Sequence, residues 1–252
     1  MTLSILSFCP CIQYTEIASG GITASGSATL TDNIIEMGGI TVSGSATVDI
    51  GNDVYDGFGG CWSLQELDST FLDASRNANH LSKTGDDTTA QVSIGWLNSQ
   101  QFASQTRLVA TNPLDNSEHS ISFWVQLEGY RTTHGIASTP YIKINHSKLS
   151  HIVCSTSSGN FYSSTKLQRD RMYHICISYD LENLKIYIDG ELDVTHAVSS
   201  LTASYTPTVG GSDGRSFFTG ELLDVRLYDH TVASSVPQCE YSNLCGNMVE
   251  YA

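Results

Sequence analysis

Three stretches in the second half of the chain alternate apolar and polar residues: 172–180, 184–190 and 220–228. A period of two residues is typical of a β-strand that buries one face. Asp189 and Gly190 separate residues 185–188 from a further strand-like run at 191–194, and both residue types accept a positive φ. The dipeptide therefore predicts a type I′ turn and an antiparallel hairpin. Since long runs at helical period are absent, the pattern predicts a β-sheet protein.

The first fifty residues contain an internal repeat. Residues 20–30 read GGITASGSATL and residues 38–48 read GGITVSGSATV, so nine of eleven positions are identical. Apolar residues alternate with Thr and Ser, which predicts that each copy is a strand with one buried face. Such thin strands bury too little surface to be stable alone, so they need the rest of the chain or another subunit. The residues expected to make this assembly contact are Ile22, Ala24, Leu30, Ile40, Val42 and Val48.

Several segments resemble laminin G-like, concanavalin A-like jelly-roll domains. Residues 57–66 look like the first strand of that family, residues 72–81 like one of its loops, and residues 119–127 like a further strand. The three alternating runs complete the series in the family's order. The resemblance covers the chain from Gly57 to about Ser234.

The resemblance implies an all-β fold, a two-sheet antiparallel jelly-roll sandwich with a β-rich N-terminal arm. The expected domains are the arm at 1–55, the jelly roll at 56–234 and a C-terminal tail at 235–252. Arg76 and Ala78 replace glycines of the family's loop, so we expect that turn to differ in shape.

Composition and charge narrow the choice of partner. The 252 residues include 12 Lys and Arg against 26 Asp and Glu, a formal net charge of −14 at pH 7. Nucleic acids and anionic membranes bind clustered cations, so neither is expected as the main partner. No run approaches the roughly 20 apolar residues of a membrane-spanning helix. No secretory signal is recognised at the N-terminus, so we expect assembly in a cytoplasm and reduced cysteines.

The carboxylate pattern argues against catalysis. Some relatives of this fold cleave glucans with carboxylates at alternating positions of one strand, where one acts as nucleophile and one as acid. Glu191 and Asp193 begin such a pattern, but Thr195 and His196 follow where the second Glu is needed. No nucleophile elbow and no phosphate-binding loop is present in the sequence. The chain is therefore predicted not to be an enzyme.

Two sets of residues are candidates for binding. Asp73 and Asn79 are oxygen donors on one loop, and Asp224 matches a family strand expected to face the same region, so this set suits Ca²⁺. Asp and Asn are also common in turns for their backbone geometry alone. Aromatic residues form the second set, which would stack on sugar rings, cover a sandwich edge or line a subunit interface: Tyr130, Tyr141, Phe161 and Tyr162.

A repeat of this kind before a laminin G-like domain resembles structural proteins of bacterial viruses. The resemblance implies a non-enzymatic virion protein, either a capsid decoration protein, a head fibre or a tail fibre, assembled in the host cytoplasm. Its expected partners are copies of itself, with a trimer predicted by analogy, other virion proteins and host-surface glycans. The alternative is a free carbohydrate-binding module with a calcium-stabilised loop. The repeat is equally compatible with an arm that packs on its own domain.

Overall fold

A computed structural model divides the chain into two compact units, residues 1–56 and 57–252. In the first unit it describes the backbone of residues 23–25, 29–31, 41–43 and 47–49. In the second it describes residues 58–249, apart from 65–69, 76, 86–89, 95–96, 103–105, 112–116, 129–133, 148, 204 and 213–215. Within this range, only the backbone is described at 90–94, 97–98, 134, 212, 216 and 243–249.

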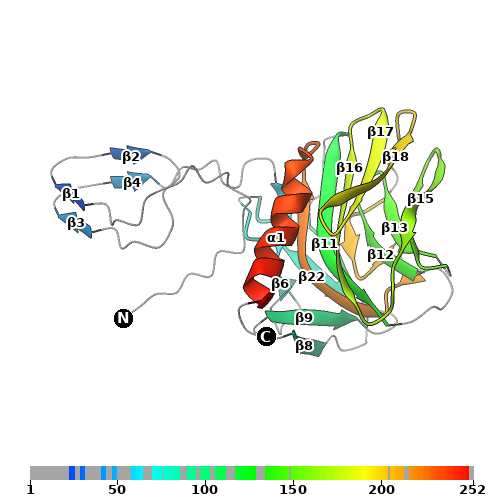
Figure 1. Cartoon of the computed structure of the whole chain (residues 1–252), viewed down its shortest axis with the longest axis horizontal. Helices are drawn as coiled ribbons and strands as arrows, with labels where there is room; N and C mark the ends of the chain where they lie inside the picture. The colour runs from blue at the N-terminus through cyan, green and yellow to red at the C-terminus, as the bar shows by residue number, and fades with distance from the viewer. Residues whose placement is uncertain are drawn as a thin grey trace. The chain divides into compact units, whose positions relative to one another are not determined.

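The second unit contains two eight-stranded sheets packed as a sandwich (Figure 1). Sheet A runs in the order β15-β14-β13-β12-β19-β10-β7-β6, and all its pairs are antiparallel. Its strands are β6 (Thr70–Phe71), β7 (Leu81–Thr84), β10 (Arg107–Ala110), β12 (His134–Ser138), β13 (Lys143–His146), β14 (His151–Thr156), β15 (Gly159–Lys166) and β19 (Thr208–Val209).

Sheet B runs in the order β18-β17-β16-β11-β22-β9-β8, and β5 also pairs with β22. Its strands are β5 (Phe58–Trp62), β8 (Ala90–Ile94), β9 (Leu97–Phe102), β11 (His119–Leu127), β16 (Met172–Tyr179), β17 (Asn183–Ile188), β18 (Glu191–Ala197) and β22 (Gly220–Tyr228). These pairs are antiparallel as well. A separate two-stranded sheet joins β20 (Gly211–Ser212) to β21 (Ser216–Phe217). The predicted all-β, two-sheet antiparallel sandwich is confirmed.

Alternation along the strands places the hydrophobic core between the two sheets. In β11, Ile121, Phe123 and Val125 belong to the core cluster. Trp124 lies between them in sequence and therefore on the opposite face of sheet B, where it is also buried. Burial of each large apolar side chain contributes about 1.5–3 kcal/mol. Because Trp124 is buried there, another part of the chain must pack on the outer face of sheet B.

The hairpin turn is found as predicted. β17 ends at Ile188 and β18 begins at Glu191, with Asp189 at φ 52° and Gly190 at φ 81° between them. Positive φ at both central residues is the signature of a type I′ turn. A Cβ atom at Gly190 would lie 2.9 Å from the Cα atom of Gln238, so the turn also packs closely against the C-terminal segment.

The C-terminal segment, predicted as a tail, forms the helix α1 (Ser235–Val249). Pro237 lies in its first turn, where the missing N–H breaks no helical hydrogen bond. The helix lies over the outer face of sheet B, across β11 and β22 (Figure 1). The sequence pattern missed α1 because its apolar residues form no stripe at helical spacing. Within the described residues, no helix is long and apolar enough to cross a membrane.

In the first unit, the two repeat copies pair as parallel strands. β1 (Thr23–Ser25) pairs with β3 (Thr41–Ser43), and β2 (Thr29–Thr31) pairs with β4 (Thr47–Asp49). The prediction of one strand per copy is therefore wrong, since each copy contributes two strands of three residues. Of the residues predicted to make assembly contacts, Ile22 and Ile40 lie outside the described residues, and only the backbone is described for the others. The assembly role therefore stays a prediction for Ile22, Ala24, Leu30, Ile40, Val42 and Val48.

Candidate functional site

The outer face of sheet A is defined by the register of its three terminal strands. Ile144 of β13 and Cys154 of β14 are fully buried in the core. Side chains alternate along a strand, so Asn145 and Val153 lie on the opposite, outer face. Asn145 pairs with Val153, and Val153 pairs with Tyr162 of β15, so the three residues form one row across the sheet.

Polar and aromatic groups gather on this outer face. The neighbouring row joins Lys143, Ser155 and Asn160. The Lys143 ammonium lies 4.3 Å from the centre of the Tyr205 ring, and the Tyr162 side chain is prominent because the residue is 48% exposed. We call this surface the Tyr162 face; it is formed by Lys143, Asn145, Ser155, Asn160, Tyr162 and Tyr205.

The Tyr162 face combines the two kinds of group that a sugar requires. A sugar ring has apolar C–H groups, which pack on an aromatic ring, and hydroxyls, which hydrogen-bond to amide, hydroxyl and ammonium groups. The amide nitrogen of Asn145 donates to the Ser155 hydroxyl at 3.4 Å, so these polar groups are already oriented toward one another. The arrangement is able to bind a polar ligand with one apolar face.

The backbone beneath Tyr162 is fixed by side chains of β18. The Asp193 carboxylate accepts hydrogen bonds from the backbone N–H groups of Ser164 at 2.6 Å and Thr165 at 3.0 Å. Nε2 of His196 donates to the carbonyl oxygen of Tyr162 at 2.8 Å. We call these three bonds the Asp193 clamp. The clamp occupies main-chain groups on the terminal strand of sheet A, so the Asp193 carboxylate has structural partners there.

The other aromatic residues predicted to bind sugar lie in different settings. Phe161 packs against the core, as does Tyr141. The Tyr141 ring also stacks on the ring of His119 with centroids 5.3 Å apart. Tyr130 lies outside the described residues. The structure therefore singles out Tyr162 as the exposed aromatic residue among the described members of this set.

Asp73 and Asn79, predicted as metal ligands, organise the loop that follows β6. The Asp73 Oδ1 atom accepts from the N–H groups of Cys61 and Ser75, each at 2.8 Å. Its Oδ2 atom accepts from the Ser75 hydroxyl at 2.6 Å and the Asn79 N–H at 2.8 Å. A carboxylate offers about four acceptor positions, and these bonds fill them. Because Ca²⁺ would have to displace some of these donors, the calcium site stays a prediction.

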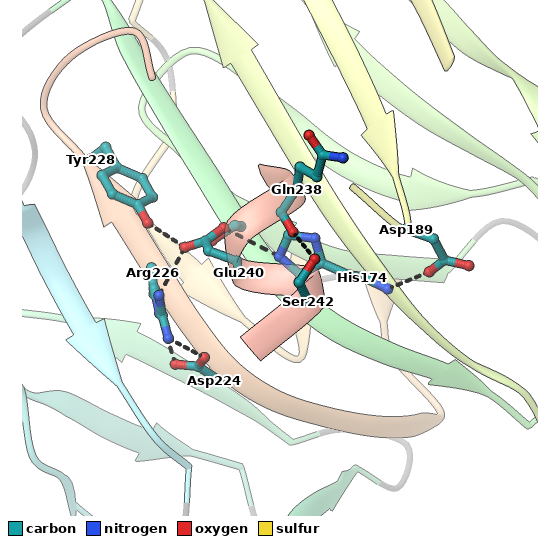
Figure 2. A network of polar contacts seen from close by, with 9 residues as sticks. His174, Asp189, Asp224, Arg226, Tyr228, Gln238, Glu240 and Ser242 are labelled. Carbon is teal, nitrogen blue, oxygen red and sulfur yellow. Dashed lines mark hydrogen bonds and ion pairs between the residues drawn. The ribbon is translucent and has the colours of Figure 1, made fainter. Parts of the chain in front are cut away.

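Asp224, the third predicted metal residue, faces a cation of the protein itself. Its Oδ1 atom accepts from Nε of Arg226 at 3.0 Å and its Oδ2 atom from Nη2 at 2.6 Å. A two-bonded pair of this kind is strong and geometrically specific. Figure 2 shows the carboxylate directed at the guanidinium. Among the described residues, no group of three His, Cys, Asp or Glu residues is placed to hold a metal ion.

Arg226 belongs to a buried polar network beneath α1 (Figure 2). Its Nη1 atom donates to Oε1 of Glu240 at 3.0 Å. The same oxygen accepts from the hydroxyls of Ser122, at 3.1 Å, and Tyr228. Nε2 of His174 lies 3.2 Å from the other Glu240 oxygen. A single helix carboxylate thus joins α1 to β11, β16 and β22.

The two carboxylates of this network have pKa values shifted in opposite directions. Burial alone would raise the pKa of Glu240, but Arg226 together with the hydrogen bonds from His174 and Tyr228 lowers this pKa to about 2. Burial raises the pKa of Asp224 above its ordinary value, because the shared guanidinium compensates it only in part. Because the network is buried between α1 and sheet B, its polar groups hold the helix in place and are not open to a ligand. On the Tyr162 face, Tyr162 and Asn160 are exposed, Lys143 and Ser155 are partly exposed, and Asn145 is buried.

Sequence reasoning missed this network, although a signal for it exists. The sequence marks His174 only as a structural strand histidine of the resembled family, and Arg226 alternates with core residues without a local sign of its buried partner Glu240. Trp124 on the same face is the signal, because a large aromatic side chain at an outer position indicates a cover. In the structure, its ring stacks on that of Tyr241 in α1 with centroids 5.8 Å apart.

Comparisons with known proteins agree with this architecture. A laminin G family model, described as the concanavalin A-like lectin/glucanases superfamily, matches residues 81–235. A search of curated proteins finds no match. Among solved structures, domain 4 of AbnA, an extracellular GH43 arabinanase from Geobacillus stearothermophilus in complex with arabinotriose, has a TM-score of 0.61 at 18% identity. The alignment covers 73% of this chain and 98% of that domain.

Two longer proteins contain a similar domain. Botulinum neurotoxin type C, in a structure concerned with its interaction with two ganglioside molecules, has a TM-score of 0.58 at 14% identity, covering 76% of this chain and 52% of that chain. A Trypanosoma rangeli sialidase mutant has a TM-score of 0.58 at 14% identity, with coverages of 77% and 33%. This chain thus spans about half of the toxin chain and a third of the sialidase. At these identities the likeness shows the fold alone, but the family match covers more than half of the sequence: the chain belongs to the concanavalin A-like lectin/glucanases superfamily.

Proposed function

We propose that the protein is a non-enzymatic glycan-binding protein that holds its ligand on the Tyr162 face. The observation that carries this proposal is the half-exposed Tyr162 ring, set among amide, hydroxyl and ammonium groups on a backbone fixed by the Asp193 clamp. The arabinotriose complex of AbnA domain 4 and the ganglioside interaction of the neurotoxin support the glycan as ligand class.

In the proposed binding mode, the C–H face of one sugar ring packs on Tyr162. Ser155 and Asn160 then lie within one or two residues along the adjoining strands, where they donate to and accept from the sugar hydroxyls. Asn145 is buried and supports the Ser155 hydroxyl from below. The Lys143 ammonium, beside the Tyr205 ring, supplies a further donor. Because Tyr162 has few rotatable bonds and a fixed backbone, little side-chain entropy is lost on binding.

For the whole chain, we propose a structural protein of the bacteriophage virion, assembled in the host cytoplasm, with the arm as anchor. Its partners are further copies of the chain and other virion proteins. The separation of residues 1–56 from the sandwich supports a division between anchoring and binding. The resemblance of the repeat to virion proteins supports the location.

A free carbohydrate-binding module is the second candidate. It is favoured by the alignment to AbnA domain 4, which covers 98% of that domain and so needs nothing beyond the sandwich. The two candidates share the Tyr162 face and differ in the role of the arm. The calcium-stabilised loop of this alternative stays a prediction.

The Tyr162 face is tested by measuring binding of the full chain to a panel of immobilised oligosaccharides. We expect Tyr162→Ala to raise Kd about tenfold or more, which corresponds to about 1.4 kcal/mol, whereas Tyr162→Phe keeps most of the affinity. The matched control is Leu72→Ala, because Leu72 is 58% exposed and follows β6 at the opposite end of sheet A.

Two results would contradict the proposal. One is equal loss of binding in Tyr162→Ala and Leu72→Ala. The other is release of sugar from a polysaccharide that stops when Glu191 or Asp193 is neutralised, since this would make the chain an enzyme.

A further inference from the structure

The repeat copies of the arm stack at a constant interval. Thr23 pairs with Thr41 in the ladder of β1 and β3, and Thr29 pairs with Thr47 in the ladder of β2 and β4. Partners in both ladders are 18 residues apart, the same offset that separates the two copies in the sequence. Both ladders are parallel, so the chain advances by one repeat and returns to the same side.

This geometry makes each repeat copy one coil of a β-solenoid. Each coil places one strand in each ladder. In register, Thr aligns with Thr, Ser with Ser, and aliphatic with aliphatic at Ala24↔Val42 and Leu30↔Val48, while the last pair is Thr31↔Asp49. In solenoids, successive coils stack through the same contact each time. A coil therefore presents, on each of its two sides, a backbone edge that fits another coil.

In the described part of the arm, the two coils leave one edge of each strand without a neighbouring strand. Within the described residues, each arm sheet has two strands, so each strand pairs along one of its two edges. Strands of three residues in pairs are too small to be stable alone, and repeat proteins need about three or more repeats. A third coil of the same chemistry would extend both ladders at once.

We infer that the arm binds the arm of a second copy of this chain, with the second coil of one copy stacked in register on the first coil of the next. The inference deepens the anchoring role in the proposed function and rests on it. The occupant is a second copy because each coil in this structure is paired with a coil of the same repeat. The contact joins different sides of the two partners, so it is head-to-tail and continues until a ring or a stack is complete.

Mixed cysteine variants of the full chain test the register. Stacking places residue 41 of one copy beside residue 23 of the next, on strands about 4.8 Å apart, within the roughly 4.4–6.8 Å that a disulfide spans between Cα atoms. Thr23→Cys and Thr41→Cys chains are prepared separately, mixed and mildly oxidised. The mismatched control mixes Thr23→Cys with Thr47→Cys, and unsubstituted chains give the level due to native cysteines.

We expect about tenfold more covalent dimer in the matched mixture than in the mismatched one, because disulfide geometry is specific. Light scattering should also give unsubstituted protein a mass of several chains. Val42→Pro, which removes an N–H from the ladder, should lower that mass, whereas Val42→Ile should preserve it.

A single-chain mass for the unsubstituted protein would overturn the inference and would fit an arm that covers its own sandwich. Equal cross-linking in the two mixtures would also overturn it. Glycan binding measured on the same samples separates this inference from the proposed function, because loss of cross-linking with intact sugar binding rejects the arm contact alone. Intact cross-linking without sugar binding rejects the ligand alone.

Discussion

His119 shows how one buried polar side chain is kept neutral. It begins β11 and is 1% exposed. Its Nδ1 atom donates to the Ser117 carbonyl at 2.9 Å, and its Nε2 atom accepts from the Thr139 hydroxyl at 2.8 Å. Burial lowers the pKa of His119 to about 4, and the bond to Ser117 offsets part of this effect. The ring therefore resists protonation until well below pH 6.

We expect His119 to make stability depend on pH between about 6.5 and 4. The unfolded chain binds a proton at its pKa of about 6.5, whereas the folded chain does so only near 4, so stability is complete above pH 6.5 and falls as the pH is lowered. The loss reaches about 3 kcal/mol at about 1.4 kcal/mol per pKa unit. Urea unfolding across this range measures it.

His119→Gln should flatten that part of the profile. His230→Gln, at a side chain that is 52% exposed, is the control for the substitution itself. Parallel profiles for the unsubstituted protein and His119→Gln would show that the dependence comes from another group.

At the scale of the element, Glu240 is a buried polar link between α1 and sheet B. Glu240 contacts side chains from three strands of sheet B, including the Arg226 guanidinium. Breaking a buried ion pair by removing one partner costs about 3–5 kcal/mol, because the other charge stays buried and unpaired. The contacts of the Glu240 carboxylate thus fix the position of α1 on sheet B.

Glu240→Ala is expected to lower the free energy of unfolding by about 3–5 kcal/mol and to increase amide exchange in α1. Ser242→Ala is the matched control, because its hydroxyl bonds to the Gln238 carbonyl within the same helix at 2.8 Å. In the unsubstituted protein, helix docking should weaken as the pH falls from about 4.5 toward 2, because the folded pKa of Glu240 lies below its ordinary value. Docking that is unchanged down to pH 2 would contradict this.

Elements were predictable where their period is local. β16 (Met172–Tyr179) and β22 (Gly220–Tyr228) coincide with alternating runs of the sequence, and the Asp189-Gly190 turn follows from residue chemistry alone. The strand β11 (His119–Leu127) was expected from the family resemblance and not from its period. The helix was not predictable, because its inward face carries Glu240 and Tyr241 and its partners are distant in sequence. The conformation of Ala78 was not predictable from its residue type either. It adopts φ 47°, in the left-handed region that the family's glycine would suit.

The candidate site was predictable only in part, for a related reason. Tyr162 could be selected from the sequence as an aromatic residue able to contact sugar. Its row, with Val153 and Asn145, depends on the register of three strands, and register is set by long-range pairing and turn geometry. The clamp residue Asp193 comes from the other sheet, so no local pattern connects it to Tyr162.

At the scale of the whole molecule, the proposed glycan binding and the proposed association belong to different units. The sandwich carries the Tyr162 face, and the arm carries the stacked coils. If copies join through their arms, several Tyr162 faces act together on one glycan-coated surface. Linked sites of this kind gain about 10²- to 10⁴-fold in overall affinity without any new contact.

On a densely coated glycan surface, we expect the unsubstituted protein to dissociate about 10²- to 10⁴-fold more slowly than Val42→Pro. Both proteins should bind a soluble oligosaccharide equally, because the substitution leaves the sandwich unaltered. Surface plasmon resonance at high and low glycan density measures the difference. Equal dissociation rates at every density would show that the faces act singly.

The Asp193 clamp affects how copies of the protein contact one another at high concentration. In the edge strand β15, the N–H groups of Ser164 and Thr165 already donate to the Asp193 carboxylate, so they are not available to pair with a strand of another molecule. Strand pairing between neighbouring sandwiches is therefore disfavoured at the β15 margin. If copies associate as inferred, strand pairing between them is directed to the ladders of the arm.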